Sequence, residues 1–380
     1  MFSYLTEEQQ AIAQNVRKLA REKIPAYQDE KYYQTLPRQL FNDFAQLGLT
    51  GLSIGEEFGG LNEGLVTSTI VMNEIARVDL GAAIFLSVHL MVAGLVNRFG
   101  SAELKKRYLP KLASGEFLGA FALTEAQAGS DAAALKTTAV KEGAQFALNG
   151  SKIYITSGGF ADLYLIFAKT DPAAGSKGIS AFLVEAGTPG LSFGSPEKKM
   201  GCELSPICSL FFDSMKVSEL QLVGELNRGY SVALGGLANG RMNIAACANG
   251  LATEAISRAT DYLKGRSQFG KPLAEFQGLQ FMLADMRMQL EAAELLTWQA
   301  AREKDLNPSS EQNVLYPSLA KCFATDAAMK ITTDALQLFG GAGYIREHTV
   351  ERLMRDAKML QIVEGTNQIQ RMVIAREMLK

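Results

Sequence analysis

One acid near the C-terminus, Glu364, has the neighbours that a catalytic base requires. It follows the apolar residues Ile362 and Val363 and precedes Gly365. Apolar surroundings disfavour an ionised carboxylate and raise its pKa toward neutrality, where a general base works best. The glycine lets a backbone N–H approach a ligand, because no Cβ is in the way. The segment therefore predicts abstraction of a proton next to a carbonyl group; the alternative is an acid that caps a helix before Thr366.

The composition is that of an ordinary globular protein. The chain has 380 residues, of which 47% are hydrophobic and 21% charged, and its net charge is −2. This length predicts two or three domains. The small net charge gives no reason to expect nucleic acid or an anionic membrane as a partner. No apolar run reaches the ~18 residues of a membrane span.

The N-terminus leads almost directly into a helical pattern, without a signal segment. We therefore expect a cytoplasmic protein of bacterial type with no membrane insertion, although a mature protein of the mitochondrial matrix would look the same. The few cysteines and histidines lack the C-x-x-C spacing and the clustering of metal sites, so we expect no metal and reduced cysteines, some of them buried. The residues concerned are Cys202, Cys208, Cys247, Cys322, His89 and His348.

The period of the apolar residues indicates which elements must position Glu364. Thr6 opens a helix as a capping box, and Ser87 to Val96 is apolar on nearly all sides, as in a buried helix. Short runs of aromatic and β-branched residues follow, with Asn149-Gly150 as a hairpin signal. Helical patterns then return, for example over Phe276 to Lys304 and Glu311 to Leu338.

We therefore predict a mainly α fold with a central β domain. The expected boundaries are residues 1–118 for an N-terminal α-helical domain, 119–225 for the β domain and 226–380 for a C-terminal α-helical bundle. One motif is misleading: Gly265 to Lys271 reads like the start of a phosphate-binding P-loop, but Pro272 replaces the hydroxyl residue and a helical pattern precedes it. No G-x-G-x-x-G follows a strand, so a Rossmann fold is not supported.

Five segments, in order along the chain, resemble the acyl-CoA dehydrogenase family. They are Ala120–Asp131 (AFALTEAQAGSD), Lys152–Gly159 (KIYITSGG), Arg266–Leu273 (RSQFGKPL), Gln337–Tyr344 (QLFGGAGY) and Arg355–Arg371, which contains Glu364. The resemblance covers essentially the whole chain. It implies three domains: an α-helical domain, a β-barrel or β-sandwich domain and a four-helix bundle. It also implies FAD as cofactor, and Glu364 as the catalytic base.

The resemblance assigns contacts with FAD in two groups. In the first, Phe121, Leu123 and Thr124 contact the isoalloxazine ring, Ser130 the pyrophosphate, and Tyr154 and Thr156 cover the ring and reach toward N5. A flat apolar ring needs an aromatic cover and donors at its edge, which these residue types supply. In the second, residues of a neighbouring subunit hold the ADP half: Arg266, Phe269, Gln277, Gln337 and Gly341. Thr366 and Gln368 match further contacts with the cofactor. A site shared between chains implies a homotetramer built as a dimer of dimers.

The reaction implied is α,β-dehydrogenation of an acyl-CoA thioester to the trans-2-enoyl-CoA. Glu364 removes the α-proton, the β-hydrogen leaves as hydride to flavin N5, and an electron-transferring flavoprotein accepts the electrons. The weakly acidic α-carbon requires donors on the carbonyl oxygen, and the Glu364 N–H is one of them. Ser130, Arg241 and Gly365 are the expected substrate contacts.

Two positions bear on the base and on the substrate. One branch of the family takes its base from the position before Arg241; here that residue is Gly240, so Glu364 has no rival. At position 238, where straight-chain enzymes commonly have Asp, this chain has Ala238. The segments Glu197–Gly201 and Gly240–Cys247 look most like short branched-chain members, notably isobutyryl-CoA dehydrogenases. No arginine occurs at Ala82 to Phe85, which argues against a dicarboxylyl substrate.

Two alternatives to a dehydrogenase stay open. One is a flavin oxidase or monooxygenase on the same scaffold, and the other is a non-catalytic FAD-bearing protein of a larger assembly.

Overall fold

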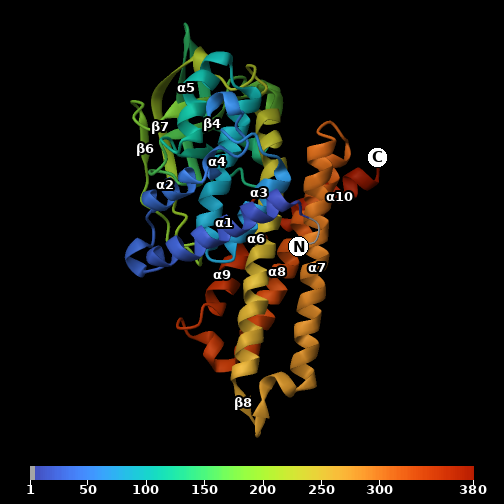
Figure 1. Cartoon of the computed structure of the whole chain (residues 1–380). Helices are drawn as coiled ribbons and strands as arrows, with labels where there is room; N and C mark the ends of the chain where they lie inside the picture. Colours follow the sequence, from blue (N-terminus) through green and yellow to red (C-terminus); the bar gives the residue numbers. More distant parts are fainter. Residues whose placement is uncertain (1–4) are drawn as a thin grey trace.

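The computed structural model describes residues 5–380 and has helices at both ends of the chain with a β-sheet between them (Figure 1). This order confirms the predicted fold class. The helices of the N-terminal part are α1 (Glu7–Lys23), α2 (Arg38–Gln46), α3 (Leu65–Ala76), α4 (Leu80–Phe99) and α5 (Ala102–Ala113). The predicted capping box is present at the start of α1: the Thr6 side chain accepts from the Gln9 N–H, and the Gln9 side chain accepts from the Thr6 N–H.

Helix α4 runs through the interior of the molecule. Asp79 caps its N-terminus by accepting from the Ala82 N–H, and Gly100 ends it. It is long and apolar enough to cross a membrane by length and composition, contrary to our expectation that no such run exists; 83% of that stretch is buried inside the protein, as in the core helix of a globular fold.

The central part is one curled sheet of seven strands. The strands are β1 (Gly119–Ala122), β2 (Thr138–Glu142), β3 (Gln145–Thr156), β4 (Leu163–Lys169), β5 (Ile179–Glu185), β6 (Leu191–Phe193) and β7 (Ile207–Ser218). Their order is β1-β4-β2-β3-β7-β6, with β5 paired to β4. Strand β4 pairs in parallel with β1 and β2, and the other pairings are antiparallel.

The hairpin predicted at Asn149-Gly150 is wrong. Strand β3 continues through this pair, and its register with β7 shifts between Leu148 and Gly150, as at a β-bulge. Gly150 has a φ of 142°, and a Cβ there would lie 2.8 Å from the Thr137 Cα, so the bulge requires glycine. The turn between β2 and β3 lies instead at Gly143, whose φ is 63°.

The C-terminal part is a bundle of long helices. They are α6 (Gly229–Gly265), α7 (Gln277–Leu306), α8 (Gln312–Phe339), α9 (Val350–Leu360) and α10 (Asn367–Met378). The patterns predicted over residues 276–304 and 311–338 are confirmed as α7 and α8. A two-stranded hairpin, β8 (Ser267–Gln268) and β9 (Lys271–Pro272), joins α6 to α7 at the end of the bundle farthest from the sheet (Figure 1).

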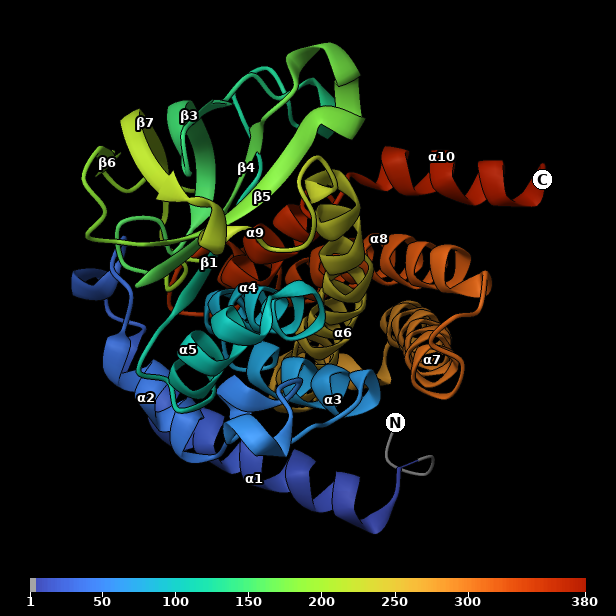
Figure 2. The same cartoon turned by 90° about the horizontal axis from the view of Figure 1, so that it is seen from above.

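Helix α6 lies between the N-terminal helices and the other long helices, as the view from above shows (Figure 2). Small residues make this central position possible. A Cβ on Gly250 would lie 2.2 Å from the Asn73 carbonyl oxygen of α3, so the two helix backbones are in close contact there. The arrangement places the N-terminal half of α6 against α4 and leaves its other sides for α8 and α9.

Candidate active site

Glu364 lies in a short turn between α9 and α10, which we call the catalytic turn (residues 361–366). Both Glu364 and Gly365 have left-handed backbones, with φ of 58° and 85°. This conformation is uncommon for a residue with a side chain. The Gln370 Nε2 donates to the carbonyls of Glu364 and Gly365 at 3.1 and 2.9 Å and thereby holds both residues in place.

The Glu364 carboxylate points away from α10. Its Oε2 is buried and has no hydrogen-bond partner among residues 5–380, although other atoms of the residue reach the surface. Thr366, not Glu364, caps α10 by accepting from the Ile369 N–H at 3.2 Å, so the helix-capping alternative is wrong. An unpaired buried carboxylate oxygen is costly in a folded protein and is typical of a group that waits for a ligand.

Burial raises the pKa of Glu364 to about 7, while the positive charges of Arg241 and then Lys321 act to lower it. The raised pKa confirms the sequence prediction, but its origin differs from the one we expected. Ile362, next but one in the chain, is 54% exposed. The residues that enclose the carboxylate come instead from other helices, namely α6 and α4.

Gly240 of α6 makes room for this carboxylate. A Cβ on Gly240 would lie 2.6 Å from Glu364 Oε2 and 2.7 Å from Met91 Cε. A side chain at position 240 would therefore occupy the space that the Glu364 carboxylate fills. Of these two positions, only 364 carries an acid in this chain.

Replacing Gly240 by alanine is expected to displace the base without unfolding the protein. The atoms that a Cβ would meet are the ends of two flexible side chains, which can move. A misplacement of about 1 Å can lower turnover by about 10²-fold. We expect such a loss in Gly240→Ala, with a nearly unchanged melting temperature. Gly278→Ala on α7, where a Cβ meets nothing within 4 Å, is the matched control; equal activities of the two variants would contradict this account.

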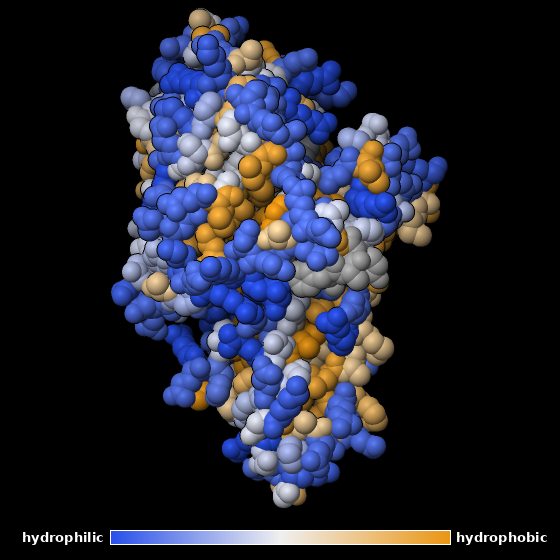
Figure 3. Space-filling model, in the orientation of Figure 1, coloured by the Kyte–Doolittle hydropathy of each residue, from blue (hydrophilic) through white to orange (hydrophobic). Residues whose placement is uncertain are grey.

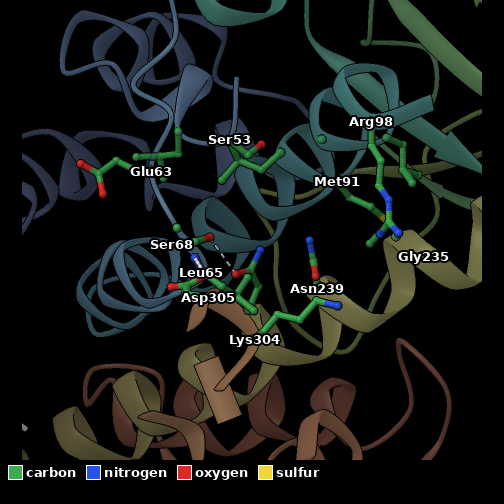
Figure 4. Close-up of a pocket in the computed structure, with 18 of the residues that line it drawn as sticks. Ser53, Glu63, Leu65, Ser68, Met91, Arg98, Gly235, Asn239, Lys304 and Asp305 are labelled. Atoms are coloured by element: carbon green, nitrogen blue, oxygen red, sulfur yellow. Dashed lines mark hydrogen bonds between the residues drawn. The ribbon is translucent and has the colours of Figure 1, made fainter. Parts of the chain in front are cut away.

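A cavity of about 280 Å³ opens beside Gly240 (Figure 4). Its walls come from the segment before α3, α3 itself, α4, the N-terminal half of α6 and the C-terminal end of α7. Met91 and Gly240 belong to this wall and also enclose the Glu364 carboxylate. The cavity and the base are therefore adjacent, and a ligand in the cavity can place a carbon atom next to Glu364.

One side of the cavity carries a buried polar chain that links three helices. Asn243 of α6 accepts a hydrogen bond from Ser68 of α3 at 2.9 Å, and donates one to Ser87 of α4 at 3.2 Å. Ser68 and Asn243 line the cavity, whereas Ser87 lies behind them. Asn243 follows Gly240 by three residues, about one helical turn along α6. The hydrogen-bonded residues Ser68 and Asn243 therefore form part of the cavity wall, a short distance from Glu364.

The other side of the cavity is positively charged. Arg98 and Lys304 both line it, and in Figure 4 both side chains extend toward the side where Asn239 lies. Partial burial, and then the Arg98 charge, lower the pKa of Lys304. The acid nearby, Asp305, is already bound, because its carboxylate accepts from the N–H groups of Leu65 and Val66.

The first group of expected FAD contacts lies together on the β domain. Tyr154 sits at a second irregularity of β3, with a φ of 57° and a ring that is 61% exposed. The Ile153 N–H donates to the Thr124 carbonyl at 3.0 Å, so the segment after β1 lies beside Tyr154. Thr124, Thr156 and Phe121 are half-buried, Leu123 is buried, and Ser130 is exposed on the loop that follows. An aromatic ring held out from a sheet beside two hydroxyls fits a flat cofactor such as FAD.

The second group lies at the far end of the bundle. Phe269 is 93% exposed at the tip of the β8–β9 hairpin, where its φ is 51°. Tyr262 and Phe339 stack at 4.1 Å and bring the ends of α6 and α8 together. All five residues of the group, Arg266, Phe269, Gln277, Gln337 and Gly341, are exposed. In the folded molecule the first group lies on the sheet and the second at the hairpin end of the bundle, far from the sheet (Figure 1). The two groups therefore cannot hold one molecule of FAD within a single chain.

The remaining candidates lie on or near the catalytic turn. Gly365 is part of it, and Gln368 is exposed on the first turn of α10. Arg241 is half-buried, donates to Ser318 Oγ at 3.4 Å and makes no ion pair within residues 5–380; burial lowers its pKa, although Glu364 acts to raise it. Arg241 is therefore not part of a structural ion pair in the described part of the chain.

Sequence reasoning missed three features of the site. They are the polar chain at Asn243, the cations Arg98 and Lys304, and Lys321 behind the catalytic turn. The only signal for Lys321 was a lone charge among small apolar residues, in S-L-A-K-C-F-A. Over residues 5–380 no group of three potential metal ligands occurs, and the four cysteines are all buried and free.

Three family models match the chain: "Acyl-CoA dehydrogenase, N-terminal domain" over residues 6–116, "middle domain" over 120–215 and "C-terminal domain" over 227–379. An acyl-CoA dehydrogenase of Bacillus subtilis is 44% identical over 99% of each chain. The mitochondrial isobutyryl-CoA dehydrogenase of Dictyostelium discoideum is 38% identical over 99% of this chain and 90% of its own. The structure of butyryl-CoA dehydrogenase from Megasphaera elsdenii is similar with a TM-score of 0.95, 40% identity and 99% coverage of each chain.

Proposed function

The chain belongs to the acyl-CoA dehydrogenase family of FAD-dependent oxidoreductases, and we propose that it oxidises the α,β bond of a short or branched acyl-CoA, with Glu364 as the base. The single observation that carries the proposal is the Glu364 carboxylate, whose buried Oε2 has no partner among residues 5–380 and which is adjacent to a cavity. With a pKa of about 7, it is ionised in about half of the molecules at neutral pH and can accept a proton there.

The catalytic turn also supports activation of the thioester. The N–H of Glu364 has no acceptor within residues 5–380, and the left-handed backbone is fixed by Gln370. A substrate carbonyl that accepts from this N–H would have its α-carbon close to the carboxylate of the same residue. The N–H then stabilises the negative charge that develops on the carbonyl oxygen as the α-proton leaves.

FAD, when bound, supplies the acceptor for the β-hydride. The residues that would hold its ring are Phe121, Leu123, Thr124, Tyr154 and Thr156. Ser130, Thr366 of the catalytic turn and Gln368 of α10 would make further contacts with FAD. We propose that the second group, at the hairpin end of the bundle, holds the ADP half of FAD in a neighbouring subunit. Arg266 suits this role, because a guanidinium binds two phosphate oxygens at once.

A shared cofactor requires an oligomer, and we propose a homotetramer built as a dimer of dimers. Phe281, Met288 and Leu295 are exposed on α7 at a spacing of seven residues, which places them on one side of the helix. Figure 3 shows hydrophobic side chains along the long helices in the lower half of the molecule. We further propose that the protein is cytoplasmic and passes its electrons to an electron-transferring flavoprotein.

The polar wall at Asn243 supports a short acyl group, because an apolar chain that extends toward it meets polar side chains. Replacing Asn243 by alanine removes the side chain that joins α3 and α4 at this wall, and it is expected to shift the preference toward longer chains. A methylene in an apolar pocket is worth about 1–3 kcal/mol, so the ratio of kcat/KM for hexanoyl- over butyryl-CoA is expected to rise about tenfold or more. The measurement is kcat/KM over a series of straight and branched acyl-CoAs; an unchanged ratio would mean that Asn243 does not limit chain length.

The function is tested by anaerobic mixing of the FAD-loaded protein with a panel of acyl-CoAs. Isobutyryl-CoA or another short acyl-CoA is expected to bleach the visible absorbance of the flavin, with formation of the enoyl-CoA. A flavin that no acyl-CoA bleaches would refute the proposal. Bleaching followed by rapid return of colour in air would favour the oxidase alternative instead.

A further inference from the structure

Lys321 of α8 is a fully buried cation that lies behind the catalytic turn. Its Nζ donates to the Gly365 carbonyl at 2.9 Å and to Asn367 Oδ1 at 2.8 Å, and the residue has no exposed surface. No carboxylate of residues 5–380 lies within ion-pair distance of it. A buried charge without an opposite charge beside it is costly. A hydrophobic side chain would be more stable at this position unless the charge serves the site.

The surrounding contacts tie both sides of the catalytic turn to one helix. Asp326 Oδ1 accepts from Gln361 Nε2 and from Asn367 Nδ2, both at 2.7 Å. Gln361 opens the turn and Asn367 follows it, so α8 fixes the two ends while Lys321 holds Gly365 directly. The Glu364–Gly365 backbone is thus gripped by Lys321 from α8 and by Gln370 from α10.

The charges around Glu364 come from three helices. They are Arg241 on α6, Lys321 and Asp326 with the thiol Cys322 on α8, and Arg371 and Arg376 on α10. Asp326 and Arg371 form an ion pair at 2.5 Å and largely compensate each other. Cys322 is buried, and its pKa is raised by burial, so it is neutral near pH 7. Arg241 and Lys321 are the two cations whose charges act directly on Glu364.

We propose that Lys321 is a positioning residue that holds the catalytic turn in its left-handed geometry and, through its charge, favours the ionised carboxylate of Glu364. This inference rests on the proposed function, in which Glu364 is the base. The two contributions can be separated, because arginine keeps the charge, glutamine keeps a donor without the charge, and methionine keeps neither. Gln370→Met weakens the grip on the turn without changing any charge.

Two pKa values define the expected pH dependence. The pKa of Lys321 is lowered to about 8, chiefly by burial, so the ammonium is still protonated at neutral pH. Glu364 must be deprotonated to act, so kcat/KM of the wild type is expected to rise with pH and level off above about 7. Loss of the Lys321 charge raises the pKa of Glu364 and moves this rise to higher pH. A displacement of one pH unit lowers the ionised fraction on the acid side about tenfold.

The test is the pH profile of kcat/KM for wild type, Lys321→Met, Lys321→Gln, Lys321→Arg, Gln370→Met and Lys330→Met. Lys330 is an exposed lysine of the same helix that pairs with Asp334, so its variant is the matched control and should behave like wild type. We expect the rise to move to higher pH in the methionine and glutamine variants, with activity partly regained in alkaline buffer. Lys321→Arg should restore the rise in kcat/KM to its wild-type pH. Gln370→Met should lose activity about equally at all pH values.

Several results would overturn the inference. If kcat/KM of Lys321→Gln rises at the same pH as in the wild type, whatever maximum it reaches, the Lys321 charge does not act on Glu364 and Lys321 is only structural. The same conclusion would follow if Lys321→Arg failed to restore the profile while remaining folded. If Lys321→Met does not fold, the glutamine variant decides the question.

A failure of the proposed function gives a different result, because the wild type would then turn over no acyl-CoA at any pH. The ionisation of Glu364 can still be followed by the carboxylate band in the infrared difference spectrum between a protein and its Glu364→Gln variant. That band is expected to appear at higher pH on the Lys321→Gln background than in wild type. An identical pH dependence on both backgrounds would refute the role of Lys321 independently of turnover.

Discussion

Replacing Glu364 by glutamine is expected to abolish turnover of acyl-CoA while leaving FAD bound. Glutamine has the same shape as the acid but cannot accept the α-proton, and a positioned general base contributes about 10²–10⁴-fold to a rate. Because Glu364 Oε2 has no hydrogen-bond partner in the described chain, the variant loses no hydrogen bond of this atom, only the charge that faces Arg241 and Lys321. We expect a loss near the upper end of this range, with an unchanged melting temperature.

The measurement is the single-turnover rate of flavin bleaching by a short acyl-CoA, together with the flavin content of the purified variant. Glu347→Gln, which changes an exposed acid before α9, is the control and should match wild type. Glu364→Asp keeps the charge on a shorter side chain, and an intermediate rate is expected for it. A glutamine variant within about tenfold of wild type would mean that the base is another residue.

The second large effect is expected at Lys152 of β3, and it concerns stability. Lys152 is fully buried, and its Nζ donates to Glu125 Oε1 at 2.7 Å and to the Leu123 carbonyl at 3.1 Å. Burial lowers the pKa of Lys152 to about 8 against the opposing effect of Glu125. Burial acts to raise the pKa of Glu125, but the Lys152 charge and the hydrogen bonds from Lys152, Thr137 and Lys136 together outweigh burial, and the net pKa is lowered. Both groups are therefore charged near pH 7.

Lys152→Met leaves the Glu125 carboxylate buried without its counterion, which is expected to cost about 3–5 kcal/mol of unfolding free energy. The variant should also bind FAD more weakly, because the Leu123 carbonyl loses its hydrogen bond from Lys152. The double variant Lys152→Met/Glu125→Leu should regain only part of the stability. It removes the unpaired charge, but it leaves the N–H groups of Lys136 and Thr137 without their acceptor.

The measurement is urea unfolding with and without added FAD. Lys216→Met, which breaks an exposed ion pair with Glu142 on the same sheet, is expected to cost no more than about 1 kcal/mol. A Lys152→Met protein as stable as this control would show that the buried pair of Lys152 and Glu125 does not support the segment after β1, which contains Leu123 and Thr124.

The periodicity of the sequence was sufficient to predict the order of helices and strands. The Thr6 capping box and the limits of α7 and α8 are local properties, because a cap or an apolar face is determined by residues within a few positions. Asn149-Gly150 shows the limit of this reasoning. The same dipeptide suits a two-residue turn and a bulge, and only the pairing of β3 with β7 decides between them.

The chemistry of the site depends on contacts between distant segments. The raised pKa of Glu364 was predicted from its neighbours in sequence, yet the burial comes from Gly240 and Met91. Lys321 and Asn243 could not be assigned roles from their local sequence, because each contacts a segment that lies far away in the chain. Tertiary packing therefore determines the environment of Glu364, whereas the proposal of Glu364 as the base came from the sequence.

Tyr154 and Phe269, which represent the two groups of expected FAD contacts, lie far apart within one chain. The proposed oligomer can therefore be tested by expressing two inactive variants together. A subunit with Glu364→Gln still offers an intact hairpin end, and a subunit with Arg266→Ala still offers an intact base. When the two inactive alleles are expressed together, one of the two shared sites in a mixed dimer combines both intact halves. The pair of alleles should then complement each other, whereas two alleles altered in the same half should not.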